Sequence, residues 1–330
     1  MPAYLQYAER TPSTAYRDML RSILEGGTRV HTKQGVDALA LAGVQMRFPM
    51  AQGAAVITER SIKGFARKAI GELCAFINGA RTLDELAAFG CDWWGPWASA
   101  EKCESRGLAP GDLGPGSYGH AFRHFTTDLD GGGDGDAGSG AGAGSGAGAS
   151  RGADAGAGPG AEGFDQFAAL VRKLRDLPDD RTAFVSPWIP QANQREAGVK
   201  SRNTIAPCHG WVHALVFDGK LHLVHNQRSG DTPIGVPSNM VQYNALGLML
   251  EQLTGYELVE YVHWIQYAHI YVNQLDQVQE MLAREPRALP TLRLNEAGRA
   301  VRDIHDYRGE HFEIDDYDPH PPISNIPVLT

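Results

Sequence analysis

The amino-acid sequence predicts a layered α/β or α+β domain, in which helices pack against a β-sheet. Segments with the apolar period of a helix are mixed along the chain with segments that alternate as strands do. Two apolar runs meet at Asp218-Gly219, a dipeptide that is typical of a tight β-hairpin turn. The chain has 330 residues, of which 42% are hydrophobic, so its core fits either one enlarged domain or two small ones.

The N-terminal part predicts two long helices, a strand and a short helix. Apolar residues recur at helical spacing over residues 13–26, where glycines close the helix. Residues 38–48 alternate and predict a strand. Residues 62–79 are apolar on every side, which predicts a helix buried against the sheet with Glu72 inside it. The sequence Thr82-Leu-Asp-Glu85 is a capping box and opens the next short helix.

Residues 131–163 consist almost entirely of Gly, Ala, Ser and Asp. Such a composition cannot bury enough apolar surface to offset the entropy lost on ordering, so we expect this segment to be disordered. We interpret it as an insertion in a surface loop, and we expect no catalytic role for it.

The C-terminal part predicts helices and strands around one long buried helix at residues 239–253, where apolar side chains recur with helical spacing. The other predicted elements, in chain order, are a helix at 164–174, a strand at 183–188, hairpin strands at 211–217 and 220–226, a strand at 256–264, a helix at 272–283 and a strand pair near Leu292 and Phe312.

The predicted hairpin places a cysteine beside an arginine. Cys208 lies just before its first strand, in Ala206-Pro-Cys-His209, and Arg228 follows its second strand. A two-residue turn folds the chain back on itself, so we expect Arg228 to return to Cys208. A thiol reacts as its thiolate, which a neighbouring guanidinium stabilises. The pair therefore predicts a nucleophilic cysteine, with a buried structural cysteine as the alternative.

Charge and cysteine content argue against several classes of function. The net charge of −9 disfavours general nucleic-acid binding, which requires a positive surface. The four cysteines lack CxxC spacing and no signal peptide precedes them, so we expect neither zinc nor secreted disulfides. We predict a cytoplasmic protein without a bound metal, and no apolar run is long enough for a membrane span.

Six motifs occur in the order found in one enzyme family. They are Ala206-Pro-Cys-His209, Gln227-Arg-Ser-Gly-Asp231, Gly235-Val-Pro-Ser-Asn239, His269-Ile-Tyr271, Arg284-Glu-Pro-Arg287 and Tyr317-Asp-Pro-His-Pro321. In these motifs the chain resembles thymidylate synthase, the folate-dependent enzyme that methylates deoxyuridylate at C5. Weaker similarity extends the resemblance to about residues 15–328, through Gln45-Met-Arg-Phe48, Gly71-Glu-Leu73, Trp93-Trp94 and Tyr118-Gly119.

The resemblance implies a fold, an assembly and two ligands. The implied fold is a twisted mixed β-sheet covered by helices, in a single catalytic domain over residues 1–330. Two such sheets would pack face to face in a homodimer. The implied substrate is a pyrimidine nucleoside monophosphate, and the implied co-substrate is 5,10-methylenetetrahydrofolate, a reduced folate.

The implied chemistry starts when the Cys208 thiolate adds to C6 of a uracil ring, which makes C5 nucleophilic. Asn239 would bind O4 and N3–H together, where an aspartate would favour cytosine; its alternative role is to cap the following helix. Glu72 would move protons near O4 and C5 through ordered water, because burial raises the pKa of a carboxyl group; its alternative is a structural salt bridge. Tyr118 and His209 would complete that water network.

The remaining implied contacts surround the nucleotide and the folate. Arg228 and Ser229 would bind the phosphate, with Arg181 reaching in from the partner subunit and Lys33 from the N-terminal loop. The other implied substrate contacts are Gln227, Asp231, His269 and Tyr271, of which the last two share one face of an extended segment and hold the sugar hydroxyl. The implied folate wall consists of Trp94, Ile205, Ile234 and Asp231.

Several positions depart from the family pattern, mostly on the folate side. Lys33 and Thr182 stand where the family has arginines for the phosphate. Ser238 replaces a phenylalanine, and Tyr267 replaces a polar loop residue near the pterin. Glu59 aligns with a lysine near the folate tail. The nucleotide side is therefore closer to the family pattern than the folate side.

Three functions remain open. Methylation is favoured, because Asn239 and Ser229 fit deoxyuridylate best. The second is hydroxymethylation of a pyrimidine nucleotide such as dUMP, UMP or CMP, in which water captures the exocyclic methylene intermediate and the hydride stays on the folate. The third is a non-catalytic nucleotide-binding homologue, which we disfavour because the expected catalytic side chains are present.

Overall fold

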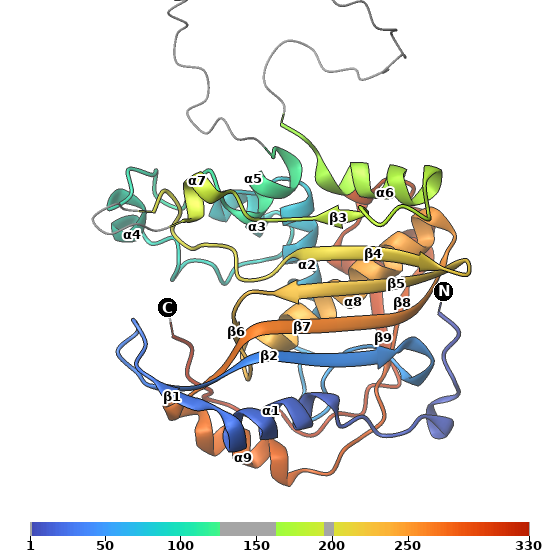
Figure 1. Ribbon diagram of the computed structural model, residues 1–330, viewed down its shortest axis with the longest axis horizontal. Helices are drawn as coiled ribbons and strands as arrows, with labels where there is room; N and C mark the ends of the chain where they lie inside the picture. The colour runs from blue at the N-terminus through green and yellow to red at the C-terminus, as the bar shows by residue number, and fades with distance from the viewer. Residues whose placement is uncertain (1, 126–162, 195–200, 330) are drawn as a thin grey trace, which may run out of the picture.

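The computed structural model describes residues 2–125, 163–194 and 201–329, and its centre is one twisted mixed β-sheet (Figure 1). Among these residues the strand order is β1-β2-β7-β5-β4-β3, and β6 pairs with β7 beyond the end of β5. The strands are β1 (Thr28–Val30), β2 (Ala38–Pro49), β3 (Phe184–Val185), β4 (Trp211–Phe217), β5 (Lys220–Gln227), β6 (Gly230–Asp231) and β7 (Glu257–Tyr271).

Strand β7 unites the sheet because it pairs on both of its edges. It is antiparallel to β2 and parallel to β5 and β6, and β4 is antiparallel to β5. The turn between β4 and β5 has φ of 50° at Asp218 and 71° at Gly219, the left-handed values that a type I′ hairpin turn requires. The predicted hairpin and the predicted mixed sheet are both confirmed.

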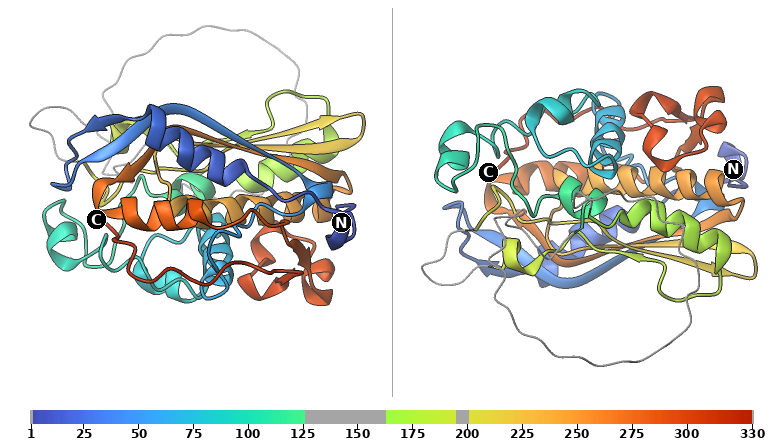
Figure 2. Two further views of the ribbon diagram at one scale, coloured as in Figure 1. Left: turned by 90° about the horizontal axis from the view of Figure 1, so that it is seen from below. Right: turned by 90° about the horizontal axis from the view of Figure 1, so that it is seen from above.

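Helix α8 (Gly235–Thr254) lies between the sheet and α2 (Ala66–Ile77), as the edge-on views in Figure 2 show. Because α8 is covered on both sides, it is apolar nearly all round. Helices α1 (Ala15–Gly26) and α9 (Leu275–Ala283) pack together beside β2, and α6 (Gln166–Asp176) packs on α8 and β3. The short helices are α3 (Leu83–Ala87), α4 (Ala100–Glu104), α5 (Tyr118–Arg123), α7 (Pro190–Asn193) and α10 (Glu296–Ala300).

The opposite face of the sheet is left open by the described helices. In β5, alternate residues are buried, and the residues between them are half-exposed or exposed. On this open face Phe184, Phe217 and Trp264 are 51%, 56% and 41% exposed. Three large apolar side chains are therefore exposed on this face, among polar ones such as His222 and Glu260.

Two smaller features lie outside the main sheet. Strands β8 (Thr291–Leu294) and β9 (Phe312–Asp315) form the predicted antiparallel pair. Between α5 and α6, Phe125 and Phe164 exchange both backbone hydrogen bonds, at 3.1 and 3.0 Å. The disorder predicted for residues 131–163 lies outside the described residues, apart from Gly163 at its end.

Several differences from the sequence predictions concern where elements begin and end. Helix α8 begins at Gly235, so Asn239 lies inside the helix and its alternative role as a cap is wrong. Strand β7 continues to Tyr271, because β2 and β6 supply partners for its backbone groups there. Helix α2 is shorter than the predicted 62–79, β3 has only two residues, and a 3-10 turn, η3 (Val272–Gln274), precedes α9. The sequence predictions did not include β1, β6, α4, α5, α7 and α10.

Candidate active site

The β4–β5 hairpin brings Arg228 beside Cys208, as the sequence predicts. Cys208 precedes β4 and Arg228 follows β5, so both lie at the same end of the hairpin. Nη2 of Arg228 lies 3.4 Å from Sγ of Cys208, and Nε donates to the carbonyl of Pro207 at 3.1 Å. The backbone N–H of Ser229 donates to the carbonyl of Cys208 at 3.3 Å. The guanidinium is thus fixed by the backbone as well as by the sulfur.

The half-buried thiol of Cys208 has its pKa set by two opposing effects. Burial raises the pKa of the Cys208 thiol above its ordinary value, while Arg228 and then Tyr118 lower it by a smaller amount. Arg228 therefore acts in the predicted direction. The net shift of this pKa is upward, because burial outweighs the two lowering contacts. That Cys208 is the nucleophile stays a prediction.

Tyr118 and His209 lie directly against the cysteine. The hydroxyl of Tyr118 accepts a hydrogen bond from the backbone N–H of Cys208 at 2.6 Å. The ring of His209 stacks on that of Tyr118 with centroids 4.4 Å apart, and its Nδ1 lies 2.7 Å from the hydroxyl of Tyr243. Burial lowers the pKa of His209 to about 3. His209 is therefore a neutral ring at physiological pH.

Glu72, on α2, is 5% exposed and is surrounded by hydrogen-bond donors. Its Oε2 accepts from the indole N–H groups of Trp93 and of Trp94, the latter at 2.8 Å, and lies 3.4 Å from Sγ of Cys91. Its Oε1 accepts from Nε2 of Gln242 at 2.9 Å. Burial raises the pKa of Glu72, as predicted, although these bonds favour the ionised form. No ion pair to Glu72 occurs among the described residues, so the salt-bridge alternative is wrong.

Asn239 lies in the second turn of α8 with both ends of its amide bound. Its Oδ1 accepts from Nε2 of Gln227 at 2.9 Å, and its Nδ2 donates to Oε1 of Gln242 at 2.9 Å. Since Gln242 also donates to Glu72, two of the predicted catalytic residues are joined through a single intervening amide.

His269 and Tyr271 share one face of β7, as their spacing predicts, with ring centroids 4.9 Å apart. Nδ1 of His269 is buried and has no hydrogen-bond partner within the described residues. Burial lowers the pKa of His269 to about 4, so this ring is also neutral. An unpartnered buried nitrogen is available to a hydroxyl group of a bound molecule.

Asp231 is brought to this group by the pairing of β6 with β7, which places it opposite His269. It accepts a hydrogen bond from Gln274 at 3.1 Å. Burial raises the pKa of Asp231 to about 7, so near neutral pH a fraction of this carboxyl group can donate as well as accept.

Two predicted phosphate ligands, Lys33 and Arg181, lie on the surface. Lys33 is exposed on the turn between β1 and β2, and Arg181 is exposed ahead of β3. Neither side chain makes a hydrogen bond or an ion pair with the described part of the chain. The backbone carbonyl of Arg181 is fixed by Nε2 of His213 at 2.9 Å, which leaves its guanidinium available.

The predicted folate wall is mixed in character. Trp94 is 8% exposed and packs edge-on against Phe76 and Tyr118, with centroids 5.7 and 6.1 Å apart. Most of this ring therefore belongs to the core. Ile205 and Ile234 are half-buried, so part of each side chain remains accessible.

Sequence reasoning missed Gln242 and two fully buried histidines, His225 and His263. Nε2 of His263 lies 2.8 Å from Oε1 of Gln227. A polar residue in a helix that is apolar all round must find a polar partner, which is the signal that marks Gln242. The alternation of β5 is the corresponding signal for His225, because it places this ring on the core face.

Outside this cluster the described residues offer few other sites. No group of three or more His, Cys, Asp or Glu side chains in these residues is arranged to hold a metal ion. None of the described helices is both long and apolar enough to cross a bilayer. Two surface hollows, of about 660 and 500 Å³, lie around β8 and β9 and include none of the predicted site residues.

One protein-family model matches nearly the whole chain. The family model described as thymidylate synthase matches residues 14–328, nearly the whole chain. This family transfers one-carbon units to C5 of pyrimidine nucleotides and generally uses methylenetetrahydrofolate. The mixed sheet with helices agrees with that fold. The chain therefore belongs to the thymidylate synthase family.

Proposed function

We propose that the protein methylates deoxyuridylate at C5, with 5,10-methylenetetrahydrofolate supplying both the carbon and the hydride. The observation that carries this proposal is the 3.4 Å contact between Sγ of Cys208 and Nη2 of Arg228 at the end of the hairpin. A sulfur nucleophile and a fixed guanidinium are the attacking group and the phosphate ligand that such a reaction requires.

Cys208 begins and ends the reaction. Its thiolate forms a bond to C6, the π electrons of the ring move towards O4, and C5 becomes nucleophilic. Arg228 offsets part of the pKa increase caused by burial and so raises the fraction of thiolate. When the hydride reaches the new C5 substituent, the C6–S bond breaks and the thiolate is restored.

Asn239 and Glu72 handle the charge and protons that develop during this addition. The amide of Asn239 donates to O4, where negative charge accumulates. Glu72 has a raised pKa and four neighbouring donors, which suits a group that accepts the C5 proton through water. Tyr118 and His209 pack against Cys208 and hold the water network in place.

The nucleotide extends from Cys208 towards β7. Arg228 and Ser229 bind the phosphate, and the unpartnered Nδ1 of His269 with Tyr271 binds the sugar hydroxyl. Gln227 and Asp231 complete the surroundings of the base and the sugar.

The proposal includes a homodimer in a reducing cytoplasm. The open sheet face, with Phe184, Phe217 and Trp264 exposed, supports packing against a second sheet. In that dimer Arg181 crosses to the phosphate of the partner subunit, which agrees with its exposure here. Lys33 adds a weaker contact from the β1–β2 turn. All four cysteines are free, as a reducing compartment favours.

The folate binds against Ile205, Ile234 and the edge of Trp94. Asp231 faces the pterin, and a carboxyl group with a pKa near 7 can exchange hydrogen bonds with a ring amide in either direction. The folate supplies the one-carbon unit and the hydride; the residues of this wall orient it over the base and exclude water.

Hydroxymethylation is the second candidate, and Tyr267 is the observation that favours it. This side chain is 40% exposed and lies 5.4 Å, centroid to centroid, from the ring of His269. A phenol at this rim adds a polar, water-accessible group where the family has a different residue, and water that enters there competes with the hydride.

One assay separates these functions. Deoxyuridylate labelled with tritium at C5 is incubated with protein and methylenetetrahydrofolate, and the nucleotide product is analysed by mass. We expect tritium release with a methyl product and dihydrofolate, and no turnover from Cys208→Ala. A hydroxymethyl product with tetrahydrofolate would establish the second candidate. Absence of tritium release would identify a non-catalytic nucleotide-binding homologue and end the proposal.

A further inference from the structure

One continuous line of buried hydrogen bonds crosses the sheet and ends on Glu72. It runs through the backbone of Gly210 and the side chains of His225, Tyr261, His263, Gln227, Asn239, Gln242 and Glu72; we call it the His225–Glu72 network. Every one of these side chains is at most 6% exposed. Four elements contribute to it, namely β5, β7, α8 and α2.

The backbone of Gly210 fixes the direction of the network at its first end. An N–H can only donate, so Nε2 of His225, 3.1 Å away, must accept. Burial lowers the pKa of His225 well below its ordinary value, so the ring is neutral and its proton lies on Nδ1. That proton points at the hydroxyl of Tyr261, 3.4 Å away. The hydroxyl in turn donates to Nδ1 of His263, 3.1 Å away.

Gln227 is fixed independently by a second backbone group. Its Nε2 donates to the carbonyl of Ser229 at 3.0 Å, and because a carbonyl can only accept, the amide cannot be turned the other way. Oε1 of Gln227 must therefore accept, at 2.8 Å, from Nε2–H of His263. Both ends of the network thus assign His263 the same tautomer, protonated on Nε2 and bare on Nδ1.

Gln242 is fixed by a third backbone group. Its Nε2 donates to the carbonyl of Ala69 and to Oε1 of Glu72, both at 2.9 Å, so its own Oε1 is the acceptor. Nδ2 of Asn239 donates to that oxygen, and Oδ1 of Asn239 accepts from Gln227. Reversing the Asn239 amide would place its Nδ2 against the donor Nε2 of Gln227 and its Oδ1 against the acceptor Oε1 of Gln242.

We propose that the His225–Glu72 network locks the Asn239 amide in the orientation that recognises uracil, with Gln242, Gln227 and His263 as positioning residues. After the two network bonds, Nδ2 keeps one hydrogen and Oδ1 keeps one lone pair. These complement O4 and N3–H of uracil. Cytosine presents a donor at N4 and an acceptor at N3, which match only a reversed amide. The inference rests on the proposed pyrimidine nucleotide substrate.

The network itself is tested without any nucleotide. Nitrogen-15 spectra of histidine-labelled protein report the tautomer of each ring, with His225→Gln and His263→Gln for assignment. We expect neutral rings at pH 6 to 8, protonated on Nδ1 in His225 and on Nε2 in His263. The opposite tautomer in either ring, or a mixture of both tautomers, would mean that the hydrogen bonds do not run in the assigned direction, and would overturn the inference.

The consequence for base recognition is tested with Gln242→Met, which keeps the side-chain volume and removes all three hydrogen bonds of the Gln242 amide. We expect wild-type protein to bind deoxyuridylate about 100-fold more tightly than deoxycytidylate, and the variant to lose about 10-fold of that ratio. Gln166→Met is the matched control, because Gln166 is also buried and also binds backbone carbonyls, but in α6. A merely structural defect weakens both nucleotides equally and leaves the ratio unchanged.

The outcomes distinguish failure of the inference from failure of the proposed function. A Gln242→Met variant that keeps the wild-type ratio rejects the positioning role and leaves the proposed reaction intact. Wild-type protein that prefers deoxycytidylate rejects the assigned amide orientation while keeping a pyrimidine substrate. Wild-type protein that binds neither nucleotide rejects the proposed function, and the inference with it.

Discussion

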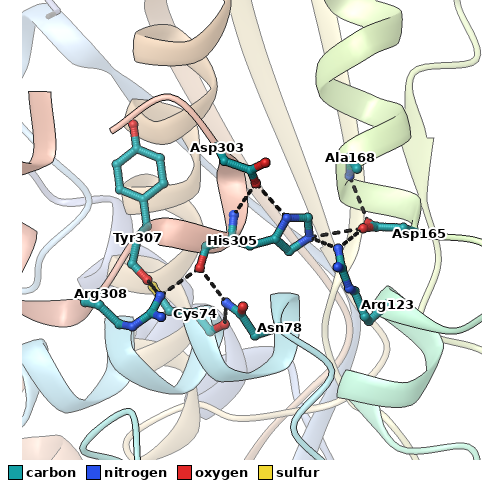
Figure 3. Close-up of polar contacts among 9 residues, drawn as sticks. All are labelled: Cys74, Asn78, Arg123, Asp165, Ala168, Asp303, His305, Tyr307 and Arg308. Atoms are coloured by element: carbon teal, nitrogen blue, oxygen red, sulfur yellow. Dashed lines mark hydrogen bonds and ion pairs between the residues drawn. The ribbon is translucent and has the colours of Figure 1, made fainter. Parts of the chain in front are cut away.

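Histidine serves opposite purposes in two regions of this protein. In the His225–Glu72 network, burial without a countercharge lowers the pKa of His263 to about 3, and the ring is a neutral donor and acceptor. Beside α5 and α6, His305 lies between two carboxylates (Figure 3). Burial also lowers the pKa of His305, but hydrogen bonds to Asp165 and Asp303 outweigh it, so the net shift is upward.

The second region, the His305 cluster, consists of Arg123, Asp165, Asp303 and His305. Nδ1 of His305 lies 2.6 Å from Asp303 and Nε2 lies 3.0 Å from Asp165, while Arg123 also binds Asp165. Asp165 caps α6 by accepting from the N–H of Ala168. The cluster therefore ties three segments, α5, α6 and the 3-10 turn η4 (Ile304–Asp306), by charge.

The surroundings of a buried histidine therefore decide whether its ring is neutral or charged. In a chain of neutral groups with fixed tautomers, the donor-to-acceptor direction of one hydrogen bond determines that of the next, because each atom must be either donor or acceptor. Charged groups hold segments together and respond to pH, because their strength depends on protonation. Changes in the first region should alter chemistry and selectivity, and changes in the second should alter stability.

Cys208→Ala should have the strongest effect, a loss of turnover by a factor of at least about 10⁴, because the proposed mechanism needs the sulfur of Cys208 for the bond to C6. Nucleotide binding should persist in a calorimetric titration. Cys74→Ala is the matched change near the His305 cluster, and it should cost about 1 kcal/mol of unfolding free energy while keeping full turnover. Substantial product from Cys208→Ala would reject covalent catalysis.

A smaller effect is expected from Asn239→Asp, which replaces the locked amide by a carboxyl group. The acceptor facing Gln242 then gains a proton or forces that amide to turn, and either change suits cytosine better. We expect the preference for deoxyuridylate over deoxycytidylate to fall by about 10- to 100-fold in competitive binding. An unchanged ratio would contradict the assigned base contact.

Removal of the ring in His305→Ala should lower the unfolding free energy by about 1–2 kcal/mol at pH 6 and leave turnover unchanged. The exposed pair of His31 with Asp37 provides the control, since His31→Ala should cost less than about 0.5 kcal/mol. Both values come from denaturant titration. Equal costs for the two variants would show that burial of the cluster adds nothing.

A still smaller effect is expected in how the loss of unfolding free energy in His305→Ala depends on pH. Because the pKa of His305 is raised on folding, its contribution is fully present below the ordinary value of 6.5 and is lost as pH rises through the folded pKa. The difference between wild type and His305→Ala should therefore shrink by a fraction of a kcal/mol or more from pH 6 to pH 8. Buried His263 has the opposite sign, since its lowered pKa makes stability fall as pH drops from 6.5 towards 3. A difference that grows with pH would contradict the assignment.

Local sequence signals predict much of the fold and of the candidate active site. The Asp218-Gly219 turn specifies the hairpin, and the hairpin specifies that Arg228 meets Cys208. Likewise the two-residue spacing of His269 and Tyr271 in a strand specifies their common face. In each case a short stretch of chain fixes the geometry.

The rest depends on packing between distant segments. Gln242 joins Asn239 to Glu72, which lies 170 positions earlier in the chain, and no spacing rule connects them. The upward shift of the Cys208 pKa is of the same kind, because neighbours in the sequence reveal charge but not desolvation. The start of α8 was misplaced for a related reason: Gly235 and Pro237 resemble turn residues until the helix is seen packed in the core.

The paired backbones of Phe125 and Phe164 have a practical consequence for engineering. Their two hydrogen bonds hold together the chain positions that flank residues 126–162. A reporter protein inserted between them would have its two ends held close together. The entropy cost of closing such a loop grows only with the logarithm of the tether length. We therefore expect an insertion between Phe125 and Phe164 to disturb the described fold little.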